Sequence, residues 1–268
     1  MTRIFPTRRL LRLAVHGVVA TAVCVLAACG STPTDETAGM TVEKLYADAR
    51  EETESGSFER AIKLYERLEG RASGTLLGQQ AQLERAFLLF RTGEKAQALS
   101  VIERFMKLHP TSPAFDYALY LQGVINFNDN LGIFGRLAGQ DLSERDQQAS
   151  RDSYLSFKQL VEQYPQSRYA DDAAVRMRYI VNSLAAYEVH VARYYFRRGA
   201  YVASANRAQQ AIQEFQTSPS TEEALSLMAQ SYDRLGLVKL RDDAGRVLRT
   251  NFPSSRFIAQ LPAPATNP

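Results

Sequence analysis

The sequence predicts an all-α protein, a solenoid of about five helix pairs with a Gly-rich insertion in the third pair. Two observations predict this fold class. From Met40 onward the apolar residues recur at helical spacing, and no stretch alternates for long with the two-residue period of a strand. Short phrases also recur along the chain, which indicates a repeated supersecondary unit rather than one irregular core.

Four short phrases mark the ends of the repeated units. Each joins a ring-bearing residue to a following Ser or Thr, and all but the third place Pro between them. Pro lacks the N–H that would continue a helix, and the following Ser or Thr can cap the next helix. The phrases are Leu108-His109-Pro110-Thr111-Ser112, Gln163-Tyr164-Pro165-Gln166-Ser167, Glu214-Phe215-Gln216-Thr217-Ser218 and Asn251-Phe252-Pro253-Ser254-Ser255.

A glycine followed five positions later by a small residue marks the middle of several units. The pairs are Gly56 with Ala61, Gly93 with Ala98, and Gly199 with Ser204. This pattern resembles the tetratricopeptide repeat, in which 34 residues form helix, tight turn and helix. There, Gly ends the first helix in a left-handed turn and the small residue lets the second helix approach closely. Gly236 is followed by Arg241, so the last repeat departs from the pattern, as terminal repeats often do.

The pattern places helices along the whole chain beyond Met40. The first three pairs are 41–54 with 57–69, 76–91 with 94–107, and 114–127 with 146–163. A segment without Gly or Pro follows at 168–198, as one long helix or as two helices meeting near Asn182-Ser183. The last helices are 201–215, 221–235 and 238–250. We therefore place repeats one to three at 40–165, repeats four and five at 166–256, and a disordered tail at 257–268.

The third repeat is interrupted at residues 128–145. This insertion contains three Gly and two Asn, together with apolar residues that include Ile133 and Phe134. Such a loop either packs its apolar residues onto the solenoid or offers them to a partner, so Ile133 and Phe134 are candidate contact residues. Its glycines are not a phosphate loop, because no Gly-Lys-Ser/Thr follows them.

The first 28 residues are typical of an export signal. Four arginines precede an apolar run at 13–25, and Leu26-Ala27-Ala28-Cys29 follows. That tetrapeptide resembles a lipobox, which implies cleavage before Cys29 and its modification with N-acyl and S-diacylglycerol groups. Residues 29–39 then form a lipidated flexible tether, and Gly30 favours the outer membrane. The alternatives are an ordinary secretory signal or a membrane-spanning helix, for which the apolar run is short.

Charge and cysteine content exclude several function classes. The chain has 32 Lys+Arg against 29 Asp+Glu, and removal of the four signal arginines leaves 28 against 29, a net of −1. The basic balance is thus a property of the signal and gives no argument for nucleic acid. Cys24 leaves with the signal and Cys29 is lipidated, so no thiol remains for chemistry. We expect no enzyme, no metal and no cofactor beyond the lipid on Cys29.

Residues 193–201 form the densest cluster of aromatic and Arg residues. Tyr and Arg are common anchors of protein interfaces, so Tyr194, Arg197 and Arg198 are candidate partner-binding residues. Ala192 and Tyr195 fall where the helix packs on its neighbour. The alternative is an ordinary solvated face. The segment 168–207 has seven Arg against three acids, whereas 41–54 has five acids against two bases, so the tethered end is expected to be acidic.

The lipobox, the short tether, five helical repeats, Leu121-Gln122-Gly123, the Gly-rich insertion and the phrase at 164–170 together resemble the BamD family, also called ComL or YfiO. The resemblance implies a lipid-anchored scaffold of the β-barrel assembly (BAM) complex on the periplasmic face of the outer membrane. It also implies binding of the BamA periplasmic domains, BamC and BamE, and recognition of C-terminal segments of unfolded outer-membrane proteins. The alternative is a periplasmic repeat lipoprotein that coordinates cell division or peptidoglycan synthesis.

Overall fold

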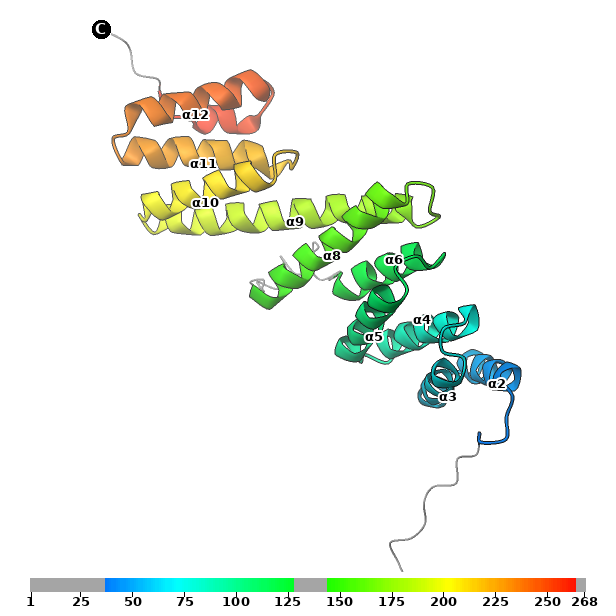
Figure 1. Cartoon of the computed structure of the whole chain (residues 1–268). Coiled ribbons are helices and arrows are strands. Elements are labelled where there is room, and N and C mark those ends of the chain that lie inside the picture. Colours follow the sequence, from blue (N-terminus) through cyan, green and yellow to red (C-terminus); the bar gives the residue numbers. More distant parts are fainter. Residues whose placement is uncertain (1–36, 128–143, 264–268) are drawn as a thin grey trace, which may run out of the picture.

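The computed structural model describes residues 37–127 and 144–263, and every regular element within these ranges is a helix. The helices stack along one direction, so that α2 lies at one end and α12 at the other (Figure 1). Three predicted site residues, Cys29, Ile133 and Phe134, lie outside the described residues. The same holds for the signal peptide and for most of the insertion.

Within the described residues the helices form five consecutive helix pairs, which confirms the predicted tetratricopeptide-like solenoid. Each helix packs on the helices before and after it, and first helices of neighbouring units also meet, α4 with α6 and α9 with α11. The units are α2 (Val42–Glu54) with α3 (Phe58–Arg71), α4 (Leu76–Arg91) with α5 (Lys95–Leu108), α6 (Phe115–Asn126) with α8 (Glu144–Gln163), α9 (Ala170–Arg197) with α10 (Tyr201–Glu214), and α11 (Ser220–Arg234) with α12 (Val238–Asn251).

The segment at 168–198 is one continuous helix, α9, of 28 residues. Its first half buries Ala173 and Ile180 in a core shared with α6 and α8. Its second half buries Val189 and Ala192 in a core shared with α10 and α11. Each half of α9 therefore has its own neighbours. The unbroken helix connects repeats one to three with repeats four and five.

The mid-unit glycines adopt the left-handed conformation that the repeat pattern predicts. Gly56, Gly93, Gly199 and Gly236 have φ of 84°, 88°, 77° and 71°. Residues other than Gly are strained at these backbone angles, so the glycines allow the tight turns between paired helices. The small residues that follow, Ala61, Ala98 and Ser204, have no exposed surface. In the last unit, Arg241 instead pairs with Asp233 at 3.1 Å and Asp242 at 2.8 Å.

The four turn phrases end helices as predicted, but the predicted serine cap is found only at Ser255, which is the N-cap of the 3₁₀ helix that follows; the N-caps of α6, α9 and α11 are Ala114, Tyr169 and Pro219, without a side-chain cap. The backbone N–H of each ring-bearing residue closes the last helical turn, with N···O distances of 2.8 to 3.1 Å. The serine three residues later then accepts a hydrogen bond from the backbone N–H two positions on, at 3.2 to 3.3 Å. The serines are Ser112, Ser167, Ser218 and Ser255.

Ordered structure continues into residues that we expected to be a disordered tail. A 3₁₀ helix, η2 (Arg256–Gln260), packs against α11 and α12. Phe257 and Ile258 are partly buried there. The last repeat has no following unit to cover its apolar side, and this short helix covers part of it. Residues 264–268 lie outside the described residues.

An ion pair between a buried carboxylate and a partly exposed arginine links α9 to α10 and gives a stability prediction. The Glu188 side chain is 3% exposed, and its Oε2 lies 3.0 Å from Nη1 of Arg207, whose side chain is 41% exposed. Replacing Arg207 with Met leaves a buried carboxylate without its cation, which we expect to lower the free energy of unfolding by about 3 kcal/mol. Urea unfolding followed by circular dichroism measures this change.

The matched control is Arg246→Met. Arg246 is 70% exposed and pairs with Asp243 within the same helix, so its loss should change stability by less than about 0.5 kcal/mol. Equal changes in the free energy of unfolding for the two substitutions would contradict a larger contribution of the Glu188–Arg207 pair to stability.

Candidate binding surfaces

The structure brings Tyr194, Arg197 and Arg198 together at one surface, which we call the α9 corner. Tyr194 and Arg197 lie in the last turn of α9 and Arg198 is its C-cap. All three are exposed, as predicted. The Arg198 guanidinium carbon lies 5.4 Å from the centre of the Tyr194 ring, a cation–π contact that orders both side chains.

The residues beside the α9 corner are held by contacts within the protein. Arg193 pairs with Glu223 of α11, and Ala192 is fully buried. Tyr195 is only partly buried, so it is not the core residue we expected. Phe196 meets Tyr201 edge-on, with ring centres 5.4 Å apart. The corner is therefore a cationic, aromatic surface on a rigid base, which is typical of an anchor for a protein partner.

Sequence analysis did not identify a cluster of three tyrosines where α6 meets the start of α9. The Tyr120 and Tyr169 rings are stacked, with centres 4.7 Å apart and planes at 19°. The Tyr117 ring lies 5.4 Å from that of Tyr169. The Tyr120 hydroxyl donates to Oδ2 of Asp172 at 2.8 Å. Tyr117 and Tyr120 are three residues apart in one predicted helix, a spacing that could have indicated a shared face.

Burial and hydrogen bonding set the charge state of this tyrosine cluster. Burial raises the pKa of Tyr117, so its phenol stays neutral at physiological pH. Burial alone would also raise the pKa of Asp172, but hydrogen bonds from Arg176 and Tyr120, with the Arg176 charge, outweigh it and lower the pKa. The cluster thus combines neutral rings with one ionised carboxylate, an arrangement suited to stacking and hydrogen bonding rather than to nucleophilic chemistry.

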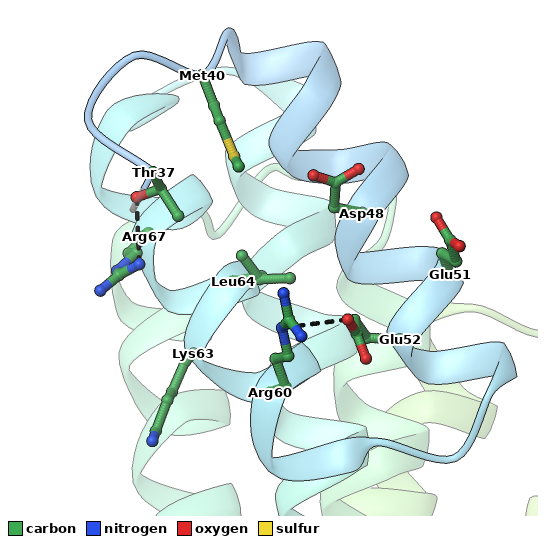
Figure 2. A pocket seen from close by; sticks show the side chains of 9 residues that line it. All are labelled: Thr37, Met40, Asp48, Glu51, Glu52, Arg60, Lys63, Leu64 and Arg67. Carbon is green, nitrogen blue, oxygen red and sulfur yellow. Dashed lines mark hydrogen bonds and ion pairs between the residues drawn. The ribbon is translucent and has the colours of Figure 1, made fainter. Parts of the chain in front are cut away.

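A groove of about 580 Å³ lies between α2 and α3, at the end of the solenoid nearest the tether (Figure 2). Its charged lining residues are segregated by helix. The acids Asp48, Glu51 and Glu52 come from α2, and the bases Arg60, Lys63 and Arg67 come from α3. Arg60 Nε lies 3.1 Å from Oε1 of Glu52, so one ion pair crosses the groove. The tethered end is therefore acidic on α2 but basic on α3.

Residues 37–127 and 144–263 hold no group of three or more His, Cys, Asp or Glu side chains arranged to bind a metal. The two histidines of these ranges are far from such a role. The His109 ring packs 5.3 Å from that of Phe105 at a helix end, and His190 is exposed on α9. In the same described ranges, no helix has the length and apolarity needed to cross a membrane.

The chain is similar to proteins of one family over most of its length. Residues 38–248 match the family model YfiO, described as an outer membrane lipoprotein. The outer membrane protein assembly factor BamD of Neisseria meningitidis serogroup A / serotype 4A is 44% identical over 248 residues, which cover 91% of this chain and 93% of that protein. BamD of Xylella fastidiosa strain Temecula1 is 34% identical over 220 residues, covering 82% of this chain and 75% of that protein.

Among solved structures, the type IV pilus biogenesis factor PilW aligns with a TM-score of 0.36 at 14% identity, covering 83% of this chain and 98% of PilW. A likeness this low carries no argument about function. The family match and the identity to BamD proteins along nearly the whole chain agree with the repeat architecture described above. The chain belongs to the YfiO (BamD) family.

Proposed function

We propose that this chain is a scaffold of the BAM complex that binds BamA and recognises unfolded outer-membrane proteins. The observation that carries the proposal is the 44% identity to a BamD assembly factor over more than nine-tenths of both proteins. The chain is accordingly a non-enzymatic outer membrane protein assembly factor. The particular contacts with BamA, BamC, BamE and substrates are the finer part of the proposal.

We assign the lipid anchor to Cys29. The lipobox Leu26-Ala27-Ala28-Cys29 supports this assignment, and so does the description of the family as outer membrane lipoproteins. Two or more acyl chains, each contributing about 0.8 kcal/mol per buried methylene, hold a protein at a bilayer without a spanning helix. The anchor places repeat one next to the periplasmic face of the outer membrane.

We assign the BamA contact to the α9 corner. Its arginines project from the junction of α9 and α10, and their charges are at an exposed surface where a partner's acidic groups can reach them. The Tyr194 ring adds an apolar contact beside them. Interfaces are commonly anchored by such Tyr and Arg residues. BamC and BamE remain expected partners of the same scaffold.

We assign the substrate segment to repeats one and two. Stacked helix pairs leave an elongated surface that fits an extended or helical peptide. On the side formed by first helices, the Gln80 side chain of α4 donates to the Tyr46 hydroxyl of α2 at 2.7 Å. The polar groups of these two side chains can form hydrogen bonds with a substrate next to an aromatic ring. The tyrosine cluster provides the same combination where α6 meets the start of α9.

The double substitution Arg197→Glu with Arg198→Glu tests the assignment of the α9 corner. Reversing two charges at an interface opposes the partner's acidic groups, so we expect at least about a tenfold loss of co-purified BamA. The matched control is Lys95→Glu with Lys107→Glu on α5, which makes the same change in net charge at exposed positions. Unchanged recovery of BamA with the Arg197 and Arg198 variant would refute the assignment.

Depleting the protein in cells separates the proposed function from its alternative. Loss of porins from the outer membrane supports a role in barrel assembly. Filamentation with normal porin levels would instead support a coordinator of cell division or peptidoglycan synthesis.

A further inference from the structure

Helix α3 carries its basic residues along one side. Arg60, Lys63, Arg67 and Arg71 recur at spacings of three and four residues, so their side chains lie on one face of the helix. All four are exposed. In Figure 2, Lys63 and Arg67 point away from the acidic side chains of α2. We call these four residues the α3 basic face.

The tether enters the folded structure directly on this face. Thr37 is only 3% exposed, and its hydroxyl accepts hydrogen bonds from Arg67 at 3.2 Å and Arg71 at 3.4 Å. Arg71 also donates to the backbone carbonyl of Met40 at 3.0 Å. Thr37, the first described residue, and Met40 therefore lie beside α3, on the same side as the bases.

The basic face also has charge to offer to a ligand. Among the described residues, the Lys63 ammonium has no ion-pair partner and no hydrogen-bond partner. Arg60 pairs with Glu52, but the Arg60 side chain is 69% exposed, and an exposed pair of this kind is weak enough to be exchanged. Lys63 and Arg60 can thus turn toward an anionic surface at small cost.

The length of the tether brings this face close to the membrane. This step rests on the lipid anchor that we propose at Cys29. Eight residue-to-residue steps separate Cys29 from Thr37 (37 − 29), and they can span at most about 29 Å. The screening length in physiological salt is about 8 Å, so a connection of this length can bring the face within electrostatic range of lipid headgroups.

We propose that the α3 basic face is a membrane-contact surface that binds the phosphate groups of anionic phospholipids. The negative charge of the lipid attracts the α3 bases and repels the α2 acids. Both effects favour the orientation of repeat one in which α3 faces the bilayer. The lipid anchor holds the chain at the membrane, and the basic face decides which side of repeat one faces it.

The test uses the acylated full-length protein in nanodiscs that carry a headgroup quencher. Acylation removes the only thiol of the mature chain, so a single introduced cysteine takes the fluorophore. Gly70→Cys places it on α3, where a new Cβ meets nothing within 4 Å, and Ser55→Cys places it in the α2–α3 turn of the same repeat. In discs with anionic lipid, we expect quenching at position 70 to exceed that at position 55.

Charge variants give the size of the effect. Lys63→Glu should weaken the preferential quenching at position 70 by at least about fivefold, the value for one basic residue at an anionic surface, whereas the control Lys107→Glu should leave it unchanged. Discs of uncharged lipid should also abolish the preference. Equal quenching at both positions, or quenching unaffected by lipid charge and by Lys63→Glu, would overturn the proposal.

Intact-mass measurement separates this inference from the anchor on which it rests. Protein with an unmodified Cys29 would refute the anchor. If such protein still showed quenching that depended on lipid charge and Lys63, the basic face would stand without the anchor.

Discussion

Replacing Gly123 with Ala is expected to lower the free energy of unfolding by about 3 kcal/mol. A Cβ on Gly123 would lie 2.4 Å from Cε1 and 2.6 Å from Cδ1 of Phe157, too close for any side chain. The Phe157 ring has no exposed surface and is packed by the core of repeat three, so it cannot swing aside. The Ser153 hydroxyl, which donates to the Gly123 carbonyl at 2.8 Å, holds α8 equally close. Chemical denaturation measures the loss.

Two further variants test whether the contact with Phe157 causes the loss of stability in Gly123→Ala. Gly70→Ala in α3 meets open space and should stabilise the protein by about 0.5–1 kcal/mol, because Ala is favoured over Gly inside a helix. Adding Phe157→Leu to Gly123→Ala removes the clashing ring edge, so the two losses should be less than additive by about 1 kcal/mol or more. Full additivity would show that the contact between α6 and α8 is not the reason for Gly123.

Replacing Cys29 with Ala, behind an ordinary cleavable secretory signal, is expected to move the protein from the membrane fraction to the soluble periplasm, except for the fraction that BamA holds. The acyl chains contribute about 0.8 kcal/mol per buried methylene, and without them only the proposed contacts with BamA and the charge contacts of the α3 basic face remain. Cell fractionation with immunoblotting measures the distribution.

The control for this experiment is Cys24→Ala behind the native signal. It removes the other cysteine of the sequence but keeps the lipobox cysteine, so the protein should stay with the membrane. Circular dichroism of the Cys29→Ala protein should show the helical content of the acylated form. If the Cys29→Ala protein remained in the outer membrane, another attachment would have to replace the lipid.

The helices were predictable because their ends are encoded locally. Gly56 and Gly93 form left-handed turns, and the phrases around Pro110 and Pro165 each stop a helix. Observed and predicted helix ends therefore agree within two residues. Whether 168–198 is one helix or two was not decided by periodicity. It is decided by the two separate cores that cover the two halves of α9.

The surfaces were predictable only in part. The exposure of Tyr194, Arg197 and Arg198 follows from helical spacing within one segment. The tyrosine cluster joins Tyr120 to residues near Asp172, 52 positions away and across the insertion, so its existence depends on packing that no local pattern specifies. The mixed charge of the tethered end was missed because the acidic composition of 41–54 describes α2 alone.

Helix α9 is one continuous element that connects repeats one to three with repeats four and five. Its 28 residues span about 42 Å at 1.5 Å per residue. A stiff rod of this length turns a tilt of one degree at one end into a shift of roughly 0.7 Å at the other. The α9 corner and the tyrosine cluster therefore lie at opposite ends of one unbroken helix, whose length sets the separation between the two surfaces.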